Sequence, residues 1–558
     1  MRLSSGGRLK PLIRAELLRA DTVRVAPAEF LGPAAFKAYQ DACRGAGGAY
    51  DHQLRAHSLR LDYLPALITA LDGGFRVGID VAVVRAAQSR ASAILASRAE
   101  AAERIGQAAD QPFAFQEVGI PWLAERQSGI LGDVVGLGKT VQAVLAIADS
   151  RPALVICPGK AKKVWRQATQ RWRPGRRWAI LDTFRWPEPG ETVIINYERL
   201  PNEKVPIPLP PPGVALIADE AHYLSHYSAQ RTKNFRRLRR AVVIAGGSSW
   251  ALSGTPMTNN PVNLLGVLQS FDLLKESFGS YPRFMYLANG KQDYWGKWKF
   301  GDPRPGYTEA LQRVMLRRLA EDVRTDMPPV LYADPIEVDI PAAARRASDE
   351  ARTAMAAAGV DWASIANGTK TLGASQEHVF TARRLIAEAK IPAVIEVAHE
   401  YLEAKEPLLI FSAHRAPIEA LRHVAGCRVI MGGEETDAFD VAEAFQRGDF
   451  MILAATIRAG GDALTMTRAA HVVFVDEEFA PHWNEQAVGR VNRIGQTRSI
   501  LVKRLLAIGT VDEDHASSLV EKRSTIKASV DQTEGQAFTV NPADLMALER
   551  YLHEDAPR

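Results

Sequence analysis

Long apolar runs and paired cysteines are both absent from this sequence of 558 residues. No stretch approaches about 18 consecutive apolar residues, and the start, MRLSSGGRLK, is not followed by the apolar core of a signal peptide. The three cysteines, Cys43, Cys157 and Cys427, lie far apart and form no CxxC pair, so they predict neither a zinc site nor a disulfide framework. We therefore expect a soluble, intracellular protein with no membrane contact.

A strong excess of charge of one sign is also lacking. The 69 lysines and arginines exceed the 64 aspartates and glutamates by five, which permits a polyanionic partner without requiring one. Hydrophobic residues make up 47% of the chain and charged residues 24%, as is typical of a soluble globular protein. A chain of this length should hold about three to four domains.

The most informative segment is GILGDVVGLGKT, residues 129–140, which runs directly into the apolar helical pattern VQAVLAIA. A phosphate group needs backbone N–H donors that no Cβ obstructs, and it is stabilised by the positive end of a helix. Gly136 and Gly138 supply such a loop. Lys139 would neutralise the terminal phosphates of a nucleotide, and the hydroxyl of Thr140 would bind magnesium.

Asp133 stands where the general phosphate-loop pattern has its first glycine, so the strict pattern fails by one residue. Taken alone, the segment is also compatible with an ordinary glycine turn before a helix. Gln116, upstream in PFAFQEVGIPWL, is a plausible reader of adenine, because its amide offers a donor beside an acceptor. An exposed helix glutamine is the alternative for that residue.

Residues 109–335 alternate apolar strands with helices, a pattern typical of a doubly wound parallel sheet. The strand 214–218 ends in Asp219 and Glu220, about 80 residues after the phosphate loop. Asp219 would hold magnesium through its water shell, and Glu220 would orient and deprotonate the attacking water. Two acidic residues at the start of a surface helix are the alternative, which Lys139 upstream disfavours.

A further apolar strand is predicted at residues 241–245, before the segment LSGTPMTNN. The hydroxyls of Ser253 and Thr255 in that segment can form hydrogen bonds that rearrange when the terminal phosphate leaves. As isolated residues they would indicate only a turn.

A second set of strands and helices follows between residues 336 and 520, with strands at LLIFSA, RVIM, FMILAA and HVVFVD. This set has no glycine–lysine loop of its own. It ends in QAVGRVNRIGQ, where Arg490 and Arg493 are spaced i and i+3, so the sequence predicts both on one helix face. Planar guanidinium groups suit the spread charge of a transferring phosphoryl group, although a basic surface helix has the same spacing.

Residues 1–108 carry no catalytic signature. The sequence predicts a strand at 57–62, a helix at 63–71, a strand at 75–80 and a long Ala-rich helix at 81–109. Such a module could grip a substrate or could serve as a packing cap on the next domain.

The order of motifs resembles the superfamily-2 helicase-like ATPases, and among them the Swi/Snf-type double-stranded DNA translocases. The resemblance covers roughly residues 110–525 and rests on FQ, DVVGLGKT, CP, DEAH, LSGTP, IFSAH, AGG and QAxGRxxRIGQ in that sequence. It extends to MLRRLAEDV at the exit from the first lobe. The compact core and small N-terminal module also resemble the annealing-helicase branch of the family.

The resemblance implies an α/β fold: two RecA-like doubly wound parallel-sheet lobes with short helical insertions, and a small N-terminal α+β module. ATP and Mg²⁺ would bind in the cleft between the lobes. The implied catalytic residues are Lys139, Asp219, Glu220, Arg490 and Arg493. The implied nucleotide-binding residues are Gln116, Gly136, Leu137, Gly138, Lys139, Thr140 and Gly461, with Thr140 and Asp219 holding the metal largely through water.

The same resemblance implies domain boundaries. They are 1–108 for the accessory module, 109–335 for the first lobe with a helical insertion at 261–325, 336–400 for a helical insertion or linker, 401–525 for the second lobe, and 526–558 for a C-terminal tail. Asp462 and Ala463 depart from the family, which usually has an apolar residue and a glycine there. Because the phosphate-contacting residues are intact, we expect this departure to affect how strongly ATP hydrolysis is coupled to movement, and not the ATP-binding site.

The function that the resemblance implies is ATP-driven movement on duplex DNA that remodels DNA structures by annealing strands or by remodelling forks or branches. Two alternatives stay open: a remodeller that displaces DNA-bound proteins, and a nucleic-acid-binding ATPase subunit of a larger repair or defence complex. DNA contacts are expected at Gly159–Lys160, after IFSAH, and at 456–461. Binding should be independent of base sequence. We expect a monomer whose protein partners, if any, bind the N-terminal module.

Overall fold

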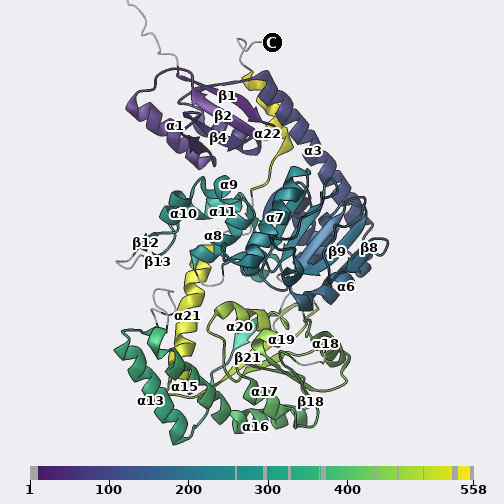
Figure 1. The fold of residues 1–558 in the computed structure, drawn as a ribbon, viewed down its shortest axis with the longest axis vertical. Helices are drawn as coiled ribbons and strands as arrows, with labels where there is room; N and C mark the ends of the chain where they lie inside the picture. The colour runs from purple at the N-terminus through teal and green to yellow at the C-terminus, as the bar shows by residue number, and fades with distance from the viewer. Residues whose placement is uncertain are drawn as a thin grey trace, which may run out of the picture.

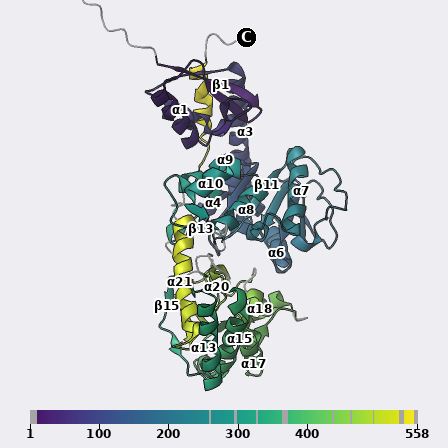
Figure 2. The same cartoon turned by 60° about the vertical axis from the view of Figure 1, so that its left-hand side comes forward.

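The computed structural model describes residues 10–257, 260–292, 298–324, 328–362, 365, 372–433, 437–460, 464–493, 495–530 and 538–552. Figure 1 shows three bodies stacked along the long axis: an N-terminal module, a first lobe and a second lobe. The same order holds in the view turned by 60° (Figure 2). None of the helices described is both long and apolar enough to cross a membrane.

The N-terminal module is a five-stranded sheet in the order β3-β4-β2-β1-β5, antiparallel except for the pair β1 and β5. Its elements are β1 (Leu12–Arg19), β2 (Thr22–Pro27), α1 (Pro33–Gly45), β3 (Ala49–Asp51), β4 (Ala56–Arg60), α2 (Leu64–Leu71), β5 (Arg76–Ile79) and α3 (Val81–Gly106). The sequence predicted β4, α2, β5 and α3 to within a few residues. It assigned no element before residue 57, and so missed the β1–β2 hairpin, α1 and β3.

The first lobe is built on a seven-stranded sheet in the order β14-β6-β11-β10-β7-β9-β8, in which neighbouring strands are parallel. The strands are β6 (Ser128–Leu131), β7 (Ala153–Cys157), β8 (Arg177–Ile180), β9 (Glu191–Asn196), β10 (Ala215–Asp219), β11 (Ser248–Leu252) and β14 (Met315–Leu316). The helices are α4 (Ala114–Ala124), α5 (Lys139–Ala146), α6 (Lys162–Trp172) and α7 (Gln230–Ile244). This arrangement confirms the predicted parallel, doubly wound sheet.

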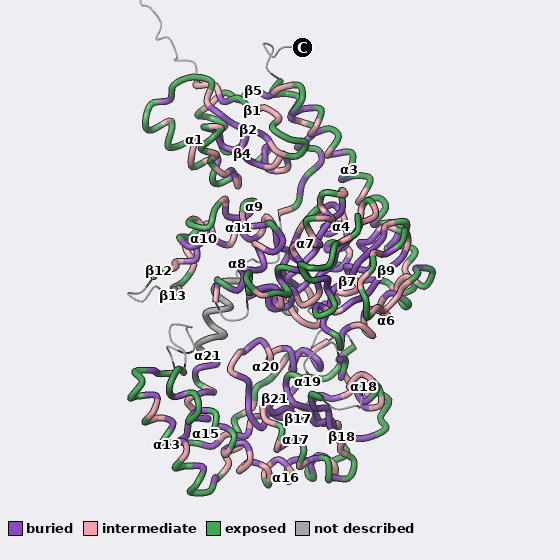
Figure 3. Tube along the Cα trace, viewed as in Figure 1, coloured by how far each residue is buried: buried purple, intermediate pink, exposed green. Residues whose placement is uncertain are grey.

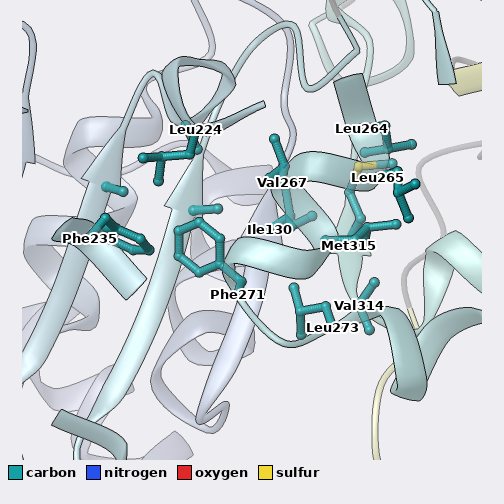
Figure 4. Close-up of a cluster of buried hydrophobic side chains, with 14 of the residues drawn as sticks. Ile130, Leu224, Phe235, Leu264, Leu265, Val267, Phe271, Leu273, Val314 and Met315 are labelled. Carbon is teal, nitrogen blue, oxygen red and sulfur yellow. The ribbon is translucent and has the colours of Figure 1, made fainter. Parts of the chain in front are cut away.

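The core of the first lobe packs α7 and the residues after it against the sheet. Figure 4 shows Phe235 of α7, Phe271, and Ile130 and Met315 from the neighbouring strands β6 and β14. Central strands such as β7 are buried along their whole length (Figure 3), because a parallel sheet is covered on both faces.

The strand predicted at residues 241–245 is wrong, because these residues end helix α7 and its C-cap. Val242 is buried against the core while Ile244 is 77% exposed, as expected on opposite sides of a helix. The true strand, β11, starts at Ser248 and Ser249. The sequence did not predict this strand because its first residues are polar. They are nevertheless buried, and the hydroxyls of Ser248 and Ser249 accept hydrogen bonds from Arg151 (2.6 Å) and Arg239 (3.1 Å), respectively.

The insertion after β11 contains short helices and one unpredicted β-hairpin. Its elements are α8 (Pro261–Ser270), α9 (Leu274–Phe278), α10 (Tyr281–Leu287), β12 (Gly290–Gln292), β13 (Trp298–Phe300) and α11 (Tyr307–Gln312). Glu276 fixes the insertion to the N-terminal module, because its carboxylate accepts hydrogen bonds from Tyr63 (2.8 Å) and Arg60 (3.2 Å).

The second lobe contains a second parallel sheet in the order β15-β21-β20-β17-β19-β18, with β16 also paired to β21. The strands are β15 (Val330–Tyr332), β16 (Ile336–Glu337), β17 (Leu408–Ser412), β18 (Cys427–Ile430), β19 (Ile452–Thr456), β20 (His471–Phe474) and β21 (Ile500–Leu506). The helices are α13 (Ala342–Ala357), α15 (Gln376–Ala389), α16 (Ile391–Glu403), α17 (Arg415–Leu421), α18 (Ala438–Arg447), α19 (Ile457–Gly460) and α20 (Pro481–Val488). Parts of this lobe begin before residue 401, the predicted start of the lobe: β15 and β16 pair with β21, and α16 packs Val394 and Ala398 against the sheet.

The C-terminal part of the chain returns to the N-terminal module. Helix α21 (Val511–Val530), yellow in Figure 1, rises from the second lobe towards the first. Residues 538–552, which we call the C-terminal return, include α22 (Pro542–Met546) and the 3₁₀ turn η7 (Ala547–Tyr551). Val540, Leu545 and Leu548 are buried in the core of the module, and the carbonyl of Val540 accepts a hydrogen bond from Arg98 (2.7 Å). The described part of the predicted tail is therefore packed structure.

Candidate active site

The phosphate loop joins the end of β6 to the start of α5. Gly136 and Gly138 have φ values of +96° and +71°, which L side chains rarely adopt. A Cβ on Gly136 would also lie 2.4 Å from the carbonyl oxygen of Asn492 in the second lobe. Glycine at this position thus serves both the loop conformation and close contact between the lobes.

Lys139 is the first residue of α5. Its ammonium donates hydrogen bonds to the carbonyl oxygens of Asp133 (2.7 Å) and Val134 (3.2 Å). Burial lowers the pKa of Lys139, and the nearby carboxylates of Glu220 and Asp219 oppose that shift. The lysine therefore lies between the loop and the carboxylates, where a terminal phosphate would need its charge.

Asp219 and Glu220 stand at the carboxyl end of β10. Burial and the adjacent Glu220 raise the pKa of Asp219, while a 2.7 Å hydrogen bond from the Trp165 indole opposes the rise. Burial would also raise the pKa of Glu220, but His222, 3.3 Å away, and the cations Lys139 and Arg490 lower it overall. Glu220 thus remains ionised to lower pH than Asp219 does, and a general base must be ionised to accept a proton.

The backbone of Glu220 adopts a left-handed conformation with φ of +50°, which is uncommon for a residue other than glycine. Strain of this kind is found where surrounding structure fixes a functional side chain. His222 continues the chain of contacts, because its Nδ1 also lies 3.4 Å from the hydroxyl of Ser253. Ser253, predicted as a sensor of nucleotide state, is thereby linked to Glu220.

We expect Trp165→Phe to move the acid limb of the ATPase pH profile upward by about one to two pH units. A hydrogen bond to a charged group contributes roughly 1.5–3 kcal/mol, and one pKa unit corresponds to 1.36 kcal/mol. Without the indole donor the pKa of Asp219 rises further, so protonation removes the metal-binding carboxylate at higher pH. The measurement is the rate of DNA-stimulated ATP hydrolysis as a function of pH.

Trp250→Phe is the matched control for this prediction. Trp250 is as buried as Trp165 and donates its indole N–H to the carbonyl oxygen of Arg126 (3.0 Å), away from the carboxylates. Both variants should lose comparable stability, on the order of 1–3 kcal/mol. A similar pH shift in both, or in neither, would contradict the role given to Trp165.

Arg490 and Arg493 follow helix α20 and are not part of it. The helix ends at Val488, and the next residues form tight turns, so the predicted common helix face is wrong. Both guanidinium groups nevertheless line the same cavity as Lys139. Arg493 donates to the hydroxyl of Thr465 (2.9 Å) and to the carbonyl oxygen of Gly489 (3.1 Å). Burial and the neighbouring Arg490 lower the pKa of Arg493.

A cavity of about 740 Å³ brings these groups together between the lobes. The first lobe and the second lobe both line it, and the predicted site residues among its lining are Gln116, Gly136, Gly138, Lys139, Thr140, Asp219, Glu220, Arg490 and Arg493. Leu137 is fully buried beside it, and Gly461 lies outside the described residues. The cavity brings the cations Lys139, Arg490 and Arg493 close to the carboxylates Asp219 and Glu220, and phosphoryl transfer needs charges of both signs in one site.

Gln116 lines the same cavity and is only 1% exposed. Its side-chain oxygen accepts a hydrogen bond from the backbone of Phe113 (3.1 Å), and its nitrogen donates to the carbonyl oxygen of Leu137 (3.1 Å). An amide has two acceptor and two donor sites, so one of each is left for adenine. Reading of adenine by Gln116 stays a prediction.

Sequence reasoning missed the residues that hold the base of the loop. The carboxylate of Asp133, fully buried, accepts hydrogen bonds from Arg318 (2.6 and 2.9 Å) and from Gln142 (3.0 Å). Arg317 donates to the carbonyl oxygen of Gly132 (2.6 Å). The only sign of this network in the sequence was the pair of arginines in MLRRLAEDV. Asp133, the partner of Arg318, lies 185 residues earlier in the sequence.

Magnesium fits this donor set. Thr140 and Asp219 line the cavity and would supply oxygen ligands beside the phosphate loop, and Mg²⁺ typically takes one or two protein oxygens together with phosphate and water. Elsewhere in the described part of the chain, no group of three or more His, Cys, Asp or Glu residues could hold a metal.

Polar contacts hold the two lobes together beside the cavity. Lys160 donates to the carbonyl oxygens of Arg458 (3.2 Å) and Ala459 (3.1 Å), and Lys163 forms an ion pair with Asp437 (2.6 Å). In this arrangement the ammonium of Lys160, predicted to contact DNA, binds the second lobe.

Part of this chain matches a known protein family, and most of it is similar to known proteins. Residues 115–333 match the SNF2-related domain. The chain is 28% identical over 422 residues to "SWI/SNF-related matrix-associated actin-dependent regulator of chromatin subfamily A-like protein 1" of Xenopus tropicalis, covering 72% of this chain and 43% of that protein. It is 24% identical over 440 residues to "DNA annealing helicase and endonuclease ZRANB3" of Homo sapiens, covering 71% and 38% respectively.

The chain thus spans less than half the length of these curated relatives. Among solved structures, the "Sulfolobus solfataricus SWI2/SNF2 ATPase core in complex with dsDNA" is 19% identical, with a TM-score of 0.33, over 77% of this chain and 94% of that one.

Proposed function

We propose that this chain is a superfamily-2 ATPase of the Swi/Snf type, which hydrolyses ATP to move along duplex DNA and so remodels DNA structures; the match to the SNF2-related domain and the similarity to the relatives above support this proposal. The observation that carries the proposal is the cavity between the lobes, where Lys139 of one lobe faces Arg490 and Arg493 of the other. A site divided in this way is complete only when the lobes meet.

The chain's own residues perform distinct parts of the hydrolysis. The glycine loop and Lys139 hold the phosphates, and Glu220 accepts a proton from the attacking water as its oxygen bonds to the terminal phosphorus. Arg490 and Arg493 stabilise the charge on the equatorial oxygens until the diphosphate leaves. Magnesium, held by Thr140 and Asp219, would supply further charge neutralisation to the phosphate oxygens.

Movement follows from the division of charge between the lobes. Loss of the terminal phosphate removes the anion that attracts both halves of the site, so the cleft opens after hydrolysis. The polar contacts across the cleft, such as Lys163 with Asp437, oppose opening weakly, because exposed ion pairs each contribute only about 0–1 kcal/mol. Alternation of closed and open states would advance the lobes along a strand held by phosphate contacts.

The test is the ATPase rate of the full chain with duplex DNA, single-stranded DNA, forked DNA and RNA. We expect stimulation by duplex and greater stimulation by forked DNA, because the relatives include an annealing helicase by name. A steep fall of stimulation with added salt should accompany it, since binding through phosphates releases counterions. Equal rates with and without every nucleic acid would contradict a DNA-driven motor.

A further inference from the structure

We propose that the hairpin formed by β12 and β13 is a DNA-binding element that holds the phosphate backbone with Lys291 and Lys299. In Figures 1 and 2 the hairpin lies on the helical insertion of the first lobe, beside α10 and away from the seven-stranded sheet. The inference rests on the proposed function, because it names a contact through which that function would engage DNA.

One face of the hairpin is anchored to the protein. Trp298 and Phe300 are partly buried against the core of the first lobe, and their rings lie 6.4 Å apart, nearly parallel. At the base of the hairpin a Cβ on Gly290 would lie 3.0 Å from the Phe300 ring and 3.1 Å from the Met285 side chain, so the strand lies close against α10. The other face is therefore presented in a fixed orientation.

Lys291 and Lys299 occupy that other face. They are directly opposite each other in the antiparallel register, while the anchoring residues are their neighbours one position away along the strands. Both lysines are exposed, and within the described part of the chain neither has an ion pair with a carboxylate. Like charges directly opposite in a sheet destabilise it, and a bound anion removes this cost.

The base of the hairpin is held by a set of hydrogen bonds around Asn289. Its backbone, with φ of +51°, accepts a hydrogen bond from Gly301, and its side chain donates to Asp302 (3.1 Å) and accepts from Arg304 (3.3 Å). The guanidinium of Arg304 also lies 4.1 Å from the ring centre of Tyr286, which is 59% exposed. A rigid base of this kind reduces the entropy cost of binding.

The chemistry of the segment favours nucleic acid over an acidic protein surface. Among its described residues, the segment 281–304 holds four lysines and arginines against one aspartate, and its two tyrosines, Tyr281 and Tyr286, are 41% and 59% exposed. Basic and aromatic side chains together are typical of surfaces that follow a phosphate backbone and stack on bases. Two ammonium groups side by side match adjacent phosphates on one strand, which is binding without base readout.

The experiment measures DNA affinity of the full chain as a function of salt, by fluorescence anisotropy with a labelled forked duplex. Each lost phosphate contact makes the slope of log affinity against log salt shallower by about 0.9. We expect Lys299→Ala to make it shallower by about one and Lys291→Ala with Lys299→Ala by about two. ATPase activity without DNA should not change, because the hairpin contributes nothing to the cavity.

Lys275→Ala is the matched control. It removes one exposed positive charge from α9 of the same insertion, away from the hairpin, and should leave the slope unchanged. Equal slopes for wild type and both hairpin variants would overturn this inference while leaving the proposed function intact. If wild type itself showed no salt-dependent DNA binding, the proposed function would fail and the inference with it.

Discussion

Glu220→Gln is expected to reduce DNA-stimulated ATP hydrolysis by a factor of about 10² to 10⁴, the usual contribution of a general base. The amide keeps the size of the side chain but cannot accept the proton of the attacking water. Its left-handed backbone and the contact with His222 fix the position of the side chain, so the substitution should change chemistry with little change in structure. The measurement is the steady-state rate at saturating duplex DNA.

Lys139→Ala should have a similar effect on turnover for a different reason, since it removes the cation beside the phosphates and so weakens ATP binding as well. Both variants should bind DNA with wild-type affinity, which is the control for folding. Retained turnover in both variants would refute the site as assigned, whereas loss of DNA binding in both would indicate misfolding.

The second large effect is expected for Arg490→Ala. A guanidinium group that stabilises the transition state in such sites accounts for a factor of about 10³ to 10⁵ in rate. Arg490 lies in the second lobe, so ATP should still bind to the glycine loop and Lys139 of the first. The variant should therefore lose the catalytic rate while keeping nucleotide affinity, measured with a fluorescent ATP analogue.

Two further variants sharpen this test. Arg490→Lys should restore little activity, because an ammonium lacks the planar, multi-donor geometry of a guanidinium. Arg498→Ala removes an arginine that forms an exposed ion pair with Glu406 (2.9 Å) in the same lobe, and should leave the rate nearly unchanged. A rate within tenfold of wild type for Arg490→Ala would exclude a transition-state role for this residue.

The sequence predicted the elements that carry the motifs better than those that do not. The phosphate loop and the two carboxylates were identified from local composition, because glycine and charge have strong positional preferences next to buried strands. Strand β11 was misplaced, since Ser248 and Ser249 are polar and only distant arginines make their burial possible. Pattern alone cannot recognise a polar strand whose partners come from elsewhere in the chain.

Asp133 illustrates the same limit within the site. In the sequence it was a departure from the phosphate-loop pattern, and no local feature explained it. In the structure its carboxylate forms an ion pair with Arg318, which lies near the other end of the lobe's sequence, and this pair fixes the base of the loop. The role of a buried charge is set by its partner, and that partner becomes visible only when the chain is folded.

The C-terminal return has a mechanical consequence for the motor. It attaches the second lobe to the N-terminal module, through α21, in addition to the direct connection between the lobes. The eight residue steps from Val530 to Phe538 can extend to at most about 29 Å. Any swing that carries the end of α21 beyond this reach must unwind the helix or pull Val540, Leu545 and Leu548 out of their core. The stroke available to one cycle is therefore bounded by the number of residues that join α21 to the C-terminal return.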